Sequence, residues 1–251
     1  MILMPPGTPA DNATPACYGA KDSKRLELRI AELFYSIQGE GALIGVPSVF
    51  IRTSGCNLRC SWCDTPYTSW RPEGTELTLD QILNEVCAHP AKHVVVTGGE
   101  PMIAPEIIPL TQRLHDAGLH ITIETAGTVF APIACDLMSI SPKLANSTPD
   151  DPTWGARHDR TRMQPEVLRE LMSRYPYQLK FVIARREDLG EVHALLAALP
   201  GARDHVILMP EGTDRDTLSE RGQWLAEICK DEGFRYSPRL HVDLWGNQRG
   251  V

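Results

Sequence analysis

Short apolar runs alternate along the chain with stretches in which apolar residues recur at helical spacing. Several runs are continuous Val, Ile and Leu, which is typical of strands buried on both faces. The runs predict strands at residues 30–36, 48–52, 93–97, 120–124, 137–140, 178–183, 205–208 and about 240–244. The amphipathic stretches predict helices at residues 79–89, 105–117, 165–173, 189–198 and 215–232. Expected N-caps are Thr78 and Asp214, and expected C-terminal stops are Gly118 and Gly233.

A strand followed by a helix, repeated, predicts an α/β fold with a mainly parallel sheet and crossover helices. The polar, irregular residues 148–161 are expected to form a long loop. Residues 1–24 are rich in Pro, Gly, Ala, Asp and Asn and lack an apolar period, which predicts a disordered leader. Residues 25–251 are then expected to form a single domain. Since parallel sheets place working residues after the carboxyl ends of their strands, the loops there are the candidates for chemistry.

The composition is that of an ordinary globular protein, with 42% hydrophobic and 23% charged residues in 251. This length fits one α/β domain, although two smaller ones are compatible with it. A net charge of -7 argues against a protein that mainly binds nucleic acid. No apolar stretch approaches the roughly 20 residues that span a bilayer, and the amino terminus does not resemble a signal peptide. We therefore expect a cytoplasmic protein whose seven cysteines are reduced, with a metal site rather than a disulfide framework.

Three cysteines, Cys56, Cys60 and Cys63, follow the predicted strand at 48–52 with the spacing C-x-x-x-C-x-x-C. Three thiolates on one short loop can bind three irons of a 4Fe-4S cluster and leave the fourth iron open to a small molecule. The alternative is a structural zinc site, which usually has four protein ligands in two pairs. No second cysteine pair exists, so a distant histidine such as His89, His93 or His115 would have to complete it.

The next predicted strand ends in Thr97-Gly98-Gly99-Glu100-Pro101, where two glycines let the backbone approach a ligand. Together with the cysteine spacing and the aromatic Trp62 before the third cysteine, this loop resembles radical S-adenosylmethionine (SAM) enzymes. The resemblance implies that Gly99 and Glu100 belong to the element that binds the methionyl group. It also implies cofactor contacts for Trp62, Cys63, Asp64, Ser141, Pro142, Lys143 and Gln178.

The segment Ser36-Ile37-Gln38-Gly39-Glu40-Gly41 distinguishes this chain from other radical SAM enzymes. With residues 45–52, the sequence Cys63-Asp64-Thr65 and residues 240–247, it closely resembles the 7-carboxy-7-deazaguanine synthase family. The resemblance extends from about Arg29 to the end of the chain. It implies a partial, partly open (β/α) barrel of mainly parallel strands, and a homodimer.

The family resemblance implies conversion of 6-carboxy-5,6,7,8-tetrahydropterin to 7-carboxy-7-deazaguanine and ammonia by a 5′-deoxyadenosyl radical, for queuosine and related deazapurines. Arg52, at the end of a strand, is a candidate for the substrate carboxylate because a guanidinium can bind it with two hydrogen bonds. The donor-rich edge of the pterin needs acceptors. The candidates for these and other substrate contacts are Ile37, Gln38, Gly39, Glu40, Thr97 and Glu124. Thr65 is similar to the family residue whose hydroxyl binds Mg²⁺, an ion that prefers oxygen ligands.

The predicted partners are the pterin and an electron-donor protein such as a flavodoxin or ferredoxin, without nucleic acid or membrane. Two other functions compete with this one. A glycyl-radical activase would share the cysteine loop but would not need Gln38-Gly39-Glu40. A zinc-binding interaction module would bind zinc without iron or sulfide.

Overall fold

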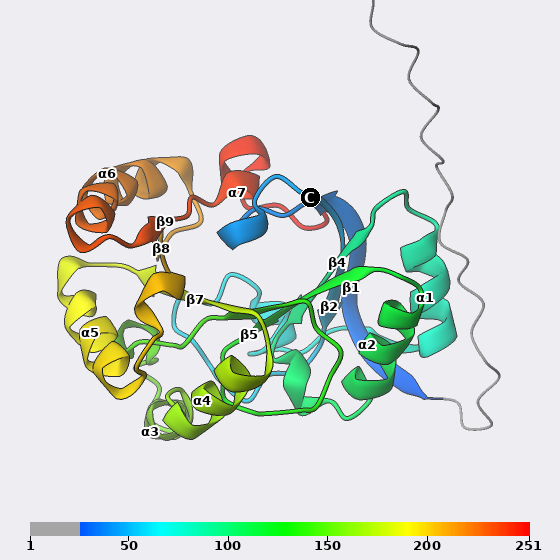
Figure 1. The fold of residues 1–251 in the computed structure, drawn as a ribbon. Coiled ribbons are helices and arrows are strands. Elements are labelled where there is room, and N and C mark those ends of the chain that lie inside the picture. The colour runs from blue at the N-terminus through cyan, green and yellow to red at the C-terminus, as the bar shows by residue number, and fades with distance from the viewer. Residues whose placement is uncertain (1–25) are drawn as a thin grey trace, which may run out of the picture.

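The computed structural model describes residues 26–251, which form a nine-stranded sheet of order β3-β1-β2-β4-β5-β6-β7-β8-β9 (Figure 1). The strands are β1 Glu27–Ile37, β2 Pro47–Thr53, β3 Thr75–Thr78, β4 His93–Gly98, β5 His120–Thr125, β6 Leu137–Ile140, β7 Tyr177–Ile183, β8 Val206–Pro210 and β9 Arg235–Tyr236. The expected leader at residues 1–24 lies outside the described residues.

The strands from β2 through β9 run parallel, and β1 is antiparallel to both of its neighbours. Their Val, Ile and Leu side chains are buried because helices cover the outside of the curved sheet (Figure 1). The helices that follow the predicted pattern are α1 Leu79–Cys87, α2 Ile107–Asp116, α4 Pro165–Arg174, α5 Leu189–Ala198 and α6 Arg215–Glu232. Within the described residues β3 and β9 are the edges of the sheet, so the barrel is partial and open, which confirms the predicted fold class.

The predicted helix ends are confirmed. Thr78 accepts a hydrogen bond from the Gln81 N–H, and the Gln81 side chain accepts one in return from the Thr78 N–H. Asp214 accepts a hydrogen bond from the Thr217 N–H at the start of α6. Gly118 and Gly233 have φ angles of +75° and +71°, the left-handed conformation that ends helices.

The strand predicted at 240–244 is wrong, because this segment forms the short helix α7 Leu240–Trp245. Leu240, Val242 and Leu244 alternate with polar residues, which mimics a strand over so few positions. In the structure Val242 is buried and the side chain of Leu244 is 48% exposed. Contacts with distant parts of the chain, rather than local periodicity, therefore decide the conformation.

The loop predicted at 148–161 is also wrong in part, since α3 Trp154–Thr161 occupies its second half. Only His158 in this helix is buried, so the segment has no apolar period. Asp151 accepts hydrogen bonds from two N–H groups at the start of the helix, and the Arg59 and Arg157 guanidiniums stack on the Trp154 ring. The short edge strands β3 and β9 carried no signal in the sequence.

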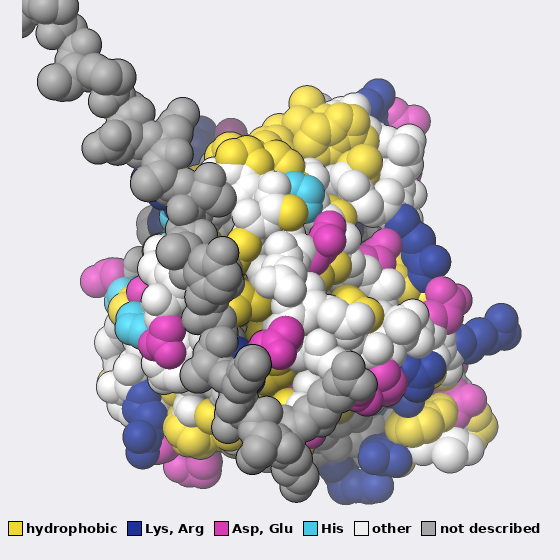
Figure 2. Space-filling view, turned by 90° about the vertical axis from the view of Figure 1, so that its right-hand side faces the viewer, with side chains coloured by type: hydrophobic (Ala, Val, Ile, Leu, Met, Phe, Trp, Pro, Cys, Tyr) yellow, Lys and Arg dark blue, Asp and Glu magenta, His cyan; other side chains and the backbone are white. Residues whose placement is uncertain are grey.

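Charged side chains of both signs are interspersed over the face shown in Figure 2, and apolar side chains gather near its upper edge. Within residues 26–251 no helix is long and apolar enough to cross a membrane.

Candidate functional site

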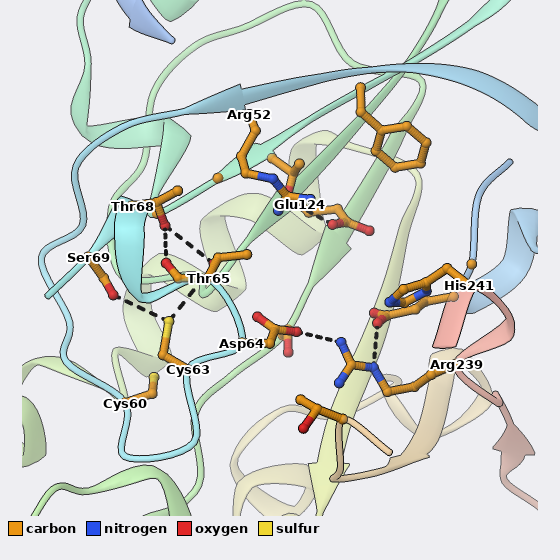
Figure 3. Close-up of a pocket in the computed structure, with 18 of the residues that line it drawn as sticks. Arg52, Cys60, Cys63, Asp64, Thr65, Thr68, Ser69, Glu124, Arg239 and His241 are labelled. Atoms are coloured by element: carbon orange, nitrogen blue, oxygen red, sulfur yellow. Dashed lines mark hydrogen bonds and ion pairs between the residues drawn. The ribbon is translucent and has the colours of Figure 1, made fainter. Parts of the chain in front are cut away.

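A cavity of about 680 Å³ opens at the carboxyl ends of the parallel strands. Its wall includes side chains from β1, β2, β4, β5, β7 and the chain end, and Figure 3 shows how some of these converge. The predicted residues that line it are Ile37, Gln38, Gly39, Glu40, Arg52, Cys56, Cys60, Trp62, Cys63, Asp64, Thr65, Thr97, Gly99, Glu124, Ser141 and Lys143. The topology thus brings sequence-distant candidates to one place.

The three cysteines line this cavity beside the apolar side chains of Leu58 and Ala126. Burial raises the pKa of the Cys56 and Cys60 thiols to about 12, so iron binding has to displace their protons. Among residues 26–251 no fourth cysteine lines the cavity. This donor set fits a 4Fe-4S cluster with one iron free of protein ligands.

Polar contacts from other segments fix the backbone of the cysteine loop. The Arg59 N–H donates to Nδ1 of the buried His158 at 3.2 Å, and the Ser61 N–H donates to the Ser147 carbonyl at 2.9 Å. The Asn57 amide donates to the Thr128 hydroxyl at 3.0 Å. These partners lie on other segments, so they tie the cysteine loop to the rest of the fold.

The Gly98-Gly99 turn packs directly against the backbone that precedes Cys56. A Cβ at Gly99 would lie 2.0 Å from the Gly55 carbonyl oxygen, and one at Gly98 would lie 2.2 Å from the Thr53 carbonyl oxygen. Gly98 also has a φ angle of +136°. Only glycine allows the loops after β2 and β4 to approach so closely.

Glu100 lies behind the cavity wall, with no exposed surface. Its carboxylate accepts hydrogen bonds from the Thr125 hydroxyl at 2.7 Å, the Ala126 N–H at 2.8 Å and the Met102 N–H at 3.2 Å. Burial raises its pKa, and these three donors oppose the rise. Glu100 therefore joins the loops that follow β4 and β5.

Of the three candidate residues in the segment after β6, Ser141 and Lys143 line the cavity. The Lys143 ammonium donates to the Ser141 hydroxyl at 2.8 Å and lies 5.7 Å from the centre of the Trp62 ring. Pro142 is buried and is not part of the lining. Gln178 is also outside the lining: its amide donates to the Ser139 hydroxyl and accepts from the Ala42 N–H.

A network of buried charges forms one wall of the cavity. Lys180 pairs with Glu40 and lies 3.8 Å from the Glu124 carboxylate, while the Arg239 Nε contacts Glu40 at 3.0 Å. Arg239 also pairs with Asp64, next to the third cysteine (Figure 3). Burial would raise the pKa of Glu40, but the two cations hold it well below its usual range. The negative charge of Glu40 is consequently neutralised by Lys180 and Arg239.

The Glu124 carboxylate faces the cavity and binds two other candidate residues. It accepts a hydrogen bond from the Thr97 hydroxyl at 2.9 Å and one from the Gln38 amide at 3.3 Å. Figure 3 shows the Arg52 side chain pointing toward Glu124. The Arg52 Nε donates to Glu32 at 2.7 Å, and Arg52 is part of the cavity lining.

Thr65 and Asp64 have different surroundings. The Thr65 Oγ lies 3.9 Å from Cys63 Sγ and accepts a hydrogen bond from the Thr68 hydroxyl at 3.3 Å. Asp64 is engaged by Arg239, which holds its pKa below the ordinary value although burial opposes this. A cation near Asp64 would therefore compete with a guanidinium.

Several residues in the lining were not found from the sequence. They include Glu32, Phe34, Tyr67, Ser69, Met209, Glu211, Arg239, His241 and residues 247–251. His241 lies in the segment predicted as a strand, and Arg239 directly precedes that segment. The contacts of Arg239 with Asp64 and Glu40 span 175 and 199 residues, and no local pattern signals such a pairing.

Comparisons with known proteins agree with this geometry. A model of the radical SAM superfamily matches residues 50–151. The 7-carboxy-7-deazaguanine synthase of Halobacterium salinarum is 46% identical over 88% of this chain and 91% of its own length. That of Rhodopirellula baltica is 44% identical over 97% of this chain and 96% of its own. The chain belongs to the 7-carboxy-7-deazaguanine synthase family.

Solved structures support the same assignment. The crystal structure of QueE from Escherichia coli is similar with a TM-score of 0.66 and 27% identity, over 86% of this chain and 95% of that one. Streptococcus suis SuiB bound to its precursor peptide SuiA shares the fold, with a TM-score of 0.53 over 78% of this chain and 49% of that one. The family matches do not favour the activase or the zinc module.

The close approach of Gly99 to Gly55 leads to a first prediction. Gly99→Ala should lower the free energy of unfolding by about 1–3 kcal/mol, because the loops must separate to admit a methyl group. Iron content after anaerobic reconstitution should fall with it. Gly190→Ala in α5 is the matched control, since its Cβ meets no atom within 4 Å. Thermal denaturation and iron analysis test this; a Gly99→Ala protein as stable and as iron-rich as Gly190→Ala would contradict it.

Proposed function

We propose that this chain converts 6-carboxy-5,6,7,8-tetrahydropterin to 7-carboxy-7-deazaguanine and ammonia, in the synthesis of queuosine and related deazapurines. One observation carries the proposal. The cavity that contains the three cysteines also contains Arg52, Gln38 and Glu124, a cation and acceptors suited to a carboxylated pterin. A cluster, a cofactor and a small substrate can therefore meet in one enclosed space.

Cys56, Cys60 and Cys63 would hold the cluster, and SAM would occupy the adjoining part of the cavity. Its proposed contacts are Trp62, Cys63, Asp64, Gly99 and the segment Ser141-Pro142-Lys143, with Glu100 and Gln178 supporting them from behind the wall. When bound, the cluster and SAM would supply radical chemistry that begins with removal of a hydrogen atom from the substrate. The chain itself binds, orients and shields the reactants.

The substrate would lie between Arg52 and the acceptors on the opposite side. Arg52 is oriented by Glu32, so its outer N–H groups are available to a carboxylate as a bidentate donor. Glu124, Gln38, Thr97, Glu40 and the 37–39 backbone provide contacts for the ring. Because Glu40 is already paired with Lys180 and Arg239, its main effect is to fix the 37–40 turn.

We further propose a flavodoxin or ferredoxin as electron donor, a cytoplasmic location and a homodimer, as in the family. Large exposed apolar side chains suit a second copy of the chain as partner. They are Tyr35, Ile103, Ile108, Tyr236, Leu244 and Trp245.

Replacement of Arg52 tests the substrate site. Arg52→Lys keeps the charge but loses the planar pair of donors. A hydrogen bond to a charged group contributes about 1.5–3 kcal/mol, so the substrate Kd should rise roughly ten- to hundredfold. The Kd of SAM should change little. Isothermal titration under anaerobic conditions measures both, and Arg29→Lys, on β1 and exposed, is the matched control. Equal losses for substrate and SAM would show that Arg52 is structural.

Magnesium would bind between the Thr65 hydroxyl and substrate oxygens, because a single hydroxyl cannot neutralise the ion. Magnesium should then raise turnover and substrate affinity together, since linkage is reciprocal. Thr65→Ala should remove most of this response while leaving the iron content and reductive cleavage of SAM intact, and Thr65→Ser should retain it. Initial rates against magnesium concentration measure the response. A full response in Thr65→Ala and none in Asp64→Asn would assign the ion to Asp64 instead.

A further inference from the structure

Ser69 is a buried polar residue next to a cluster cysteine. Ser69 lines the cavity and is only 2% exposed to solvent. Its hydroxyl oxygen lies 3.3 Å from Cys63 Sγ, within hydrogen-bond distance for sulfur (Figure 3). A buried hydroxyl needs such a partner, because an unsatisfied one is costly.

The position of Ser69 is fixed from both sides. It follows a 3₁₀ turn at Pro66–Thr68, and its own N–H donates to the Pro66 carbonyl. The fully buried Thr68 accepts a hydrogen bond from the Gly55 N–H at 2.9 Å through its carbonyl. On the other side, the Trp70 indole N–H donates to the Cys60 carbonyl at 3.0 Å. Ser69 therefore lies between two attachments to the cysteine loop, and its hydroxyl is directed at the sulfur.

The direction of this hydrogen bond follows from the chemistry of the ligand. A cysteine that binds iron is a thiolate and has no proton to donate, so the Ser69 O–H must be the donor. A hydrogen bond to a ligand sulfur stabilises negative charge there, and the reduced cluster carries one more negative charge than the oxidised one. The interaction is consequently stronger in the reduced state.

We propose that Ser69 is a positioning residue that raises the reduction potential of the cluster through its hydrogen bond to Cys63. The inference rests on the proposed cluster site. The reaction it affects is the transfer of one electron from an external donor to the oxidised cluster. Loss of the hydroxyl lowers the potential and makes that transfer less favourable, without removing a cluster ligand.

The test compares Ser69→Ala with the wild type and with Ser61→Ala after anaerobic reconstitution. Ser61 is an exposed serine of the same loop whose hydroxyl points to the Asn146 carbonyl, so its removal should not change the potential. Potentiometric titration followed by electron paramagnetic resonance, without SAM or substrate, gives the midpoint of each protein. At the wild-type midpoint, the ratio of reduced to oxidised cluster should fall several-fold in Ser69→Ala and stay near one in Ser61→Ala.

A second readout observes the proton itself. In D₂O, pulsed electron paramagnetic resonance of the reduced wild type should show an exchangeable deuteron coupled to the cluster that is missing in Ser69→Ala. A normal iron content with an unchanged midpoint in Ser69→Ala would overturn the proposal. If Ser69→Ala binds no cluster, the Ser69→Thr variant, which keeps a hydroxyl, is tested instead. A Ser69→Thr protein that binds the cluster and has the wild-type midpoint potential supports the hydrogen bond. A Ser69→Thr protein that also binds no cluster refutes the proposal. A wild type without iron and sulfide would instead refute the cluster site.

Discussion

The contacts of Arg239 with Glu40 and Asp64 join three parts of the chain that are far apart in sequence. Glu40 follows β1, Asp64 follows the third cluster cysteine, and Arg239 immediately precedes α7. The Glu40 and Arg239 side chains are largely buried, whereas the Asp64 side chain is 38% exposed. A buried charge is tolerated only when it is paired, so Arg239 needs its carboxylate partners. The turn at 37–40, the cysteine loop and the C-terminal segment therefore have to assemble together. Lys180 extends the constraint to β7 and, through Glu124, to β5.

This assembly completes the wall of the cavity in the open sheet. The parallel strands direct their loops to one edge, but in residues 26–251 the sheet ends at β3 and β9, so strands alone do not surround the cavity. The C-terminal residues 247–251 form part of its lining, and the Arg249 guanidinium stacks on the Tyr67 ring beside the cysteine loop. The last part of the chain thus contributes to the wall of the site.

The sequence predicts the parallel sheet well because its strands are long apolar runs that end in distinctive loops. The residues at those ends, such as Arg52, Thr97 and Glu124, could be placed at one site from topology alone. Arg239, Glu32 and Ser69 could not, because their partners are set by tertiary folding rather than by spacing. The same reason explains the wrong prediction at 240–244, where five residues can satisfy either periodicity. Glu100 and Gln178 illustrate a further limit: a motif identifies residues near a cofactor without telling which of them face it.

Anaerobic turnover tests the central claim most directly. The reconstituted protein is incubated with a reductant, SAM and 6-carboxy-5,6,7,8-tetrahydropterin, and the products are followed by mass spectrometry and ammonia assay. We expect 7-carboxy-7-deazaguanine and ammonia in equal amounts, with no product when SAM or the reductant is omitted. Cleavage of SAM by an iron- and sulfide-loaded protein that leaves the pterin unchanged would contradict the account.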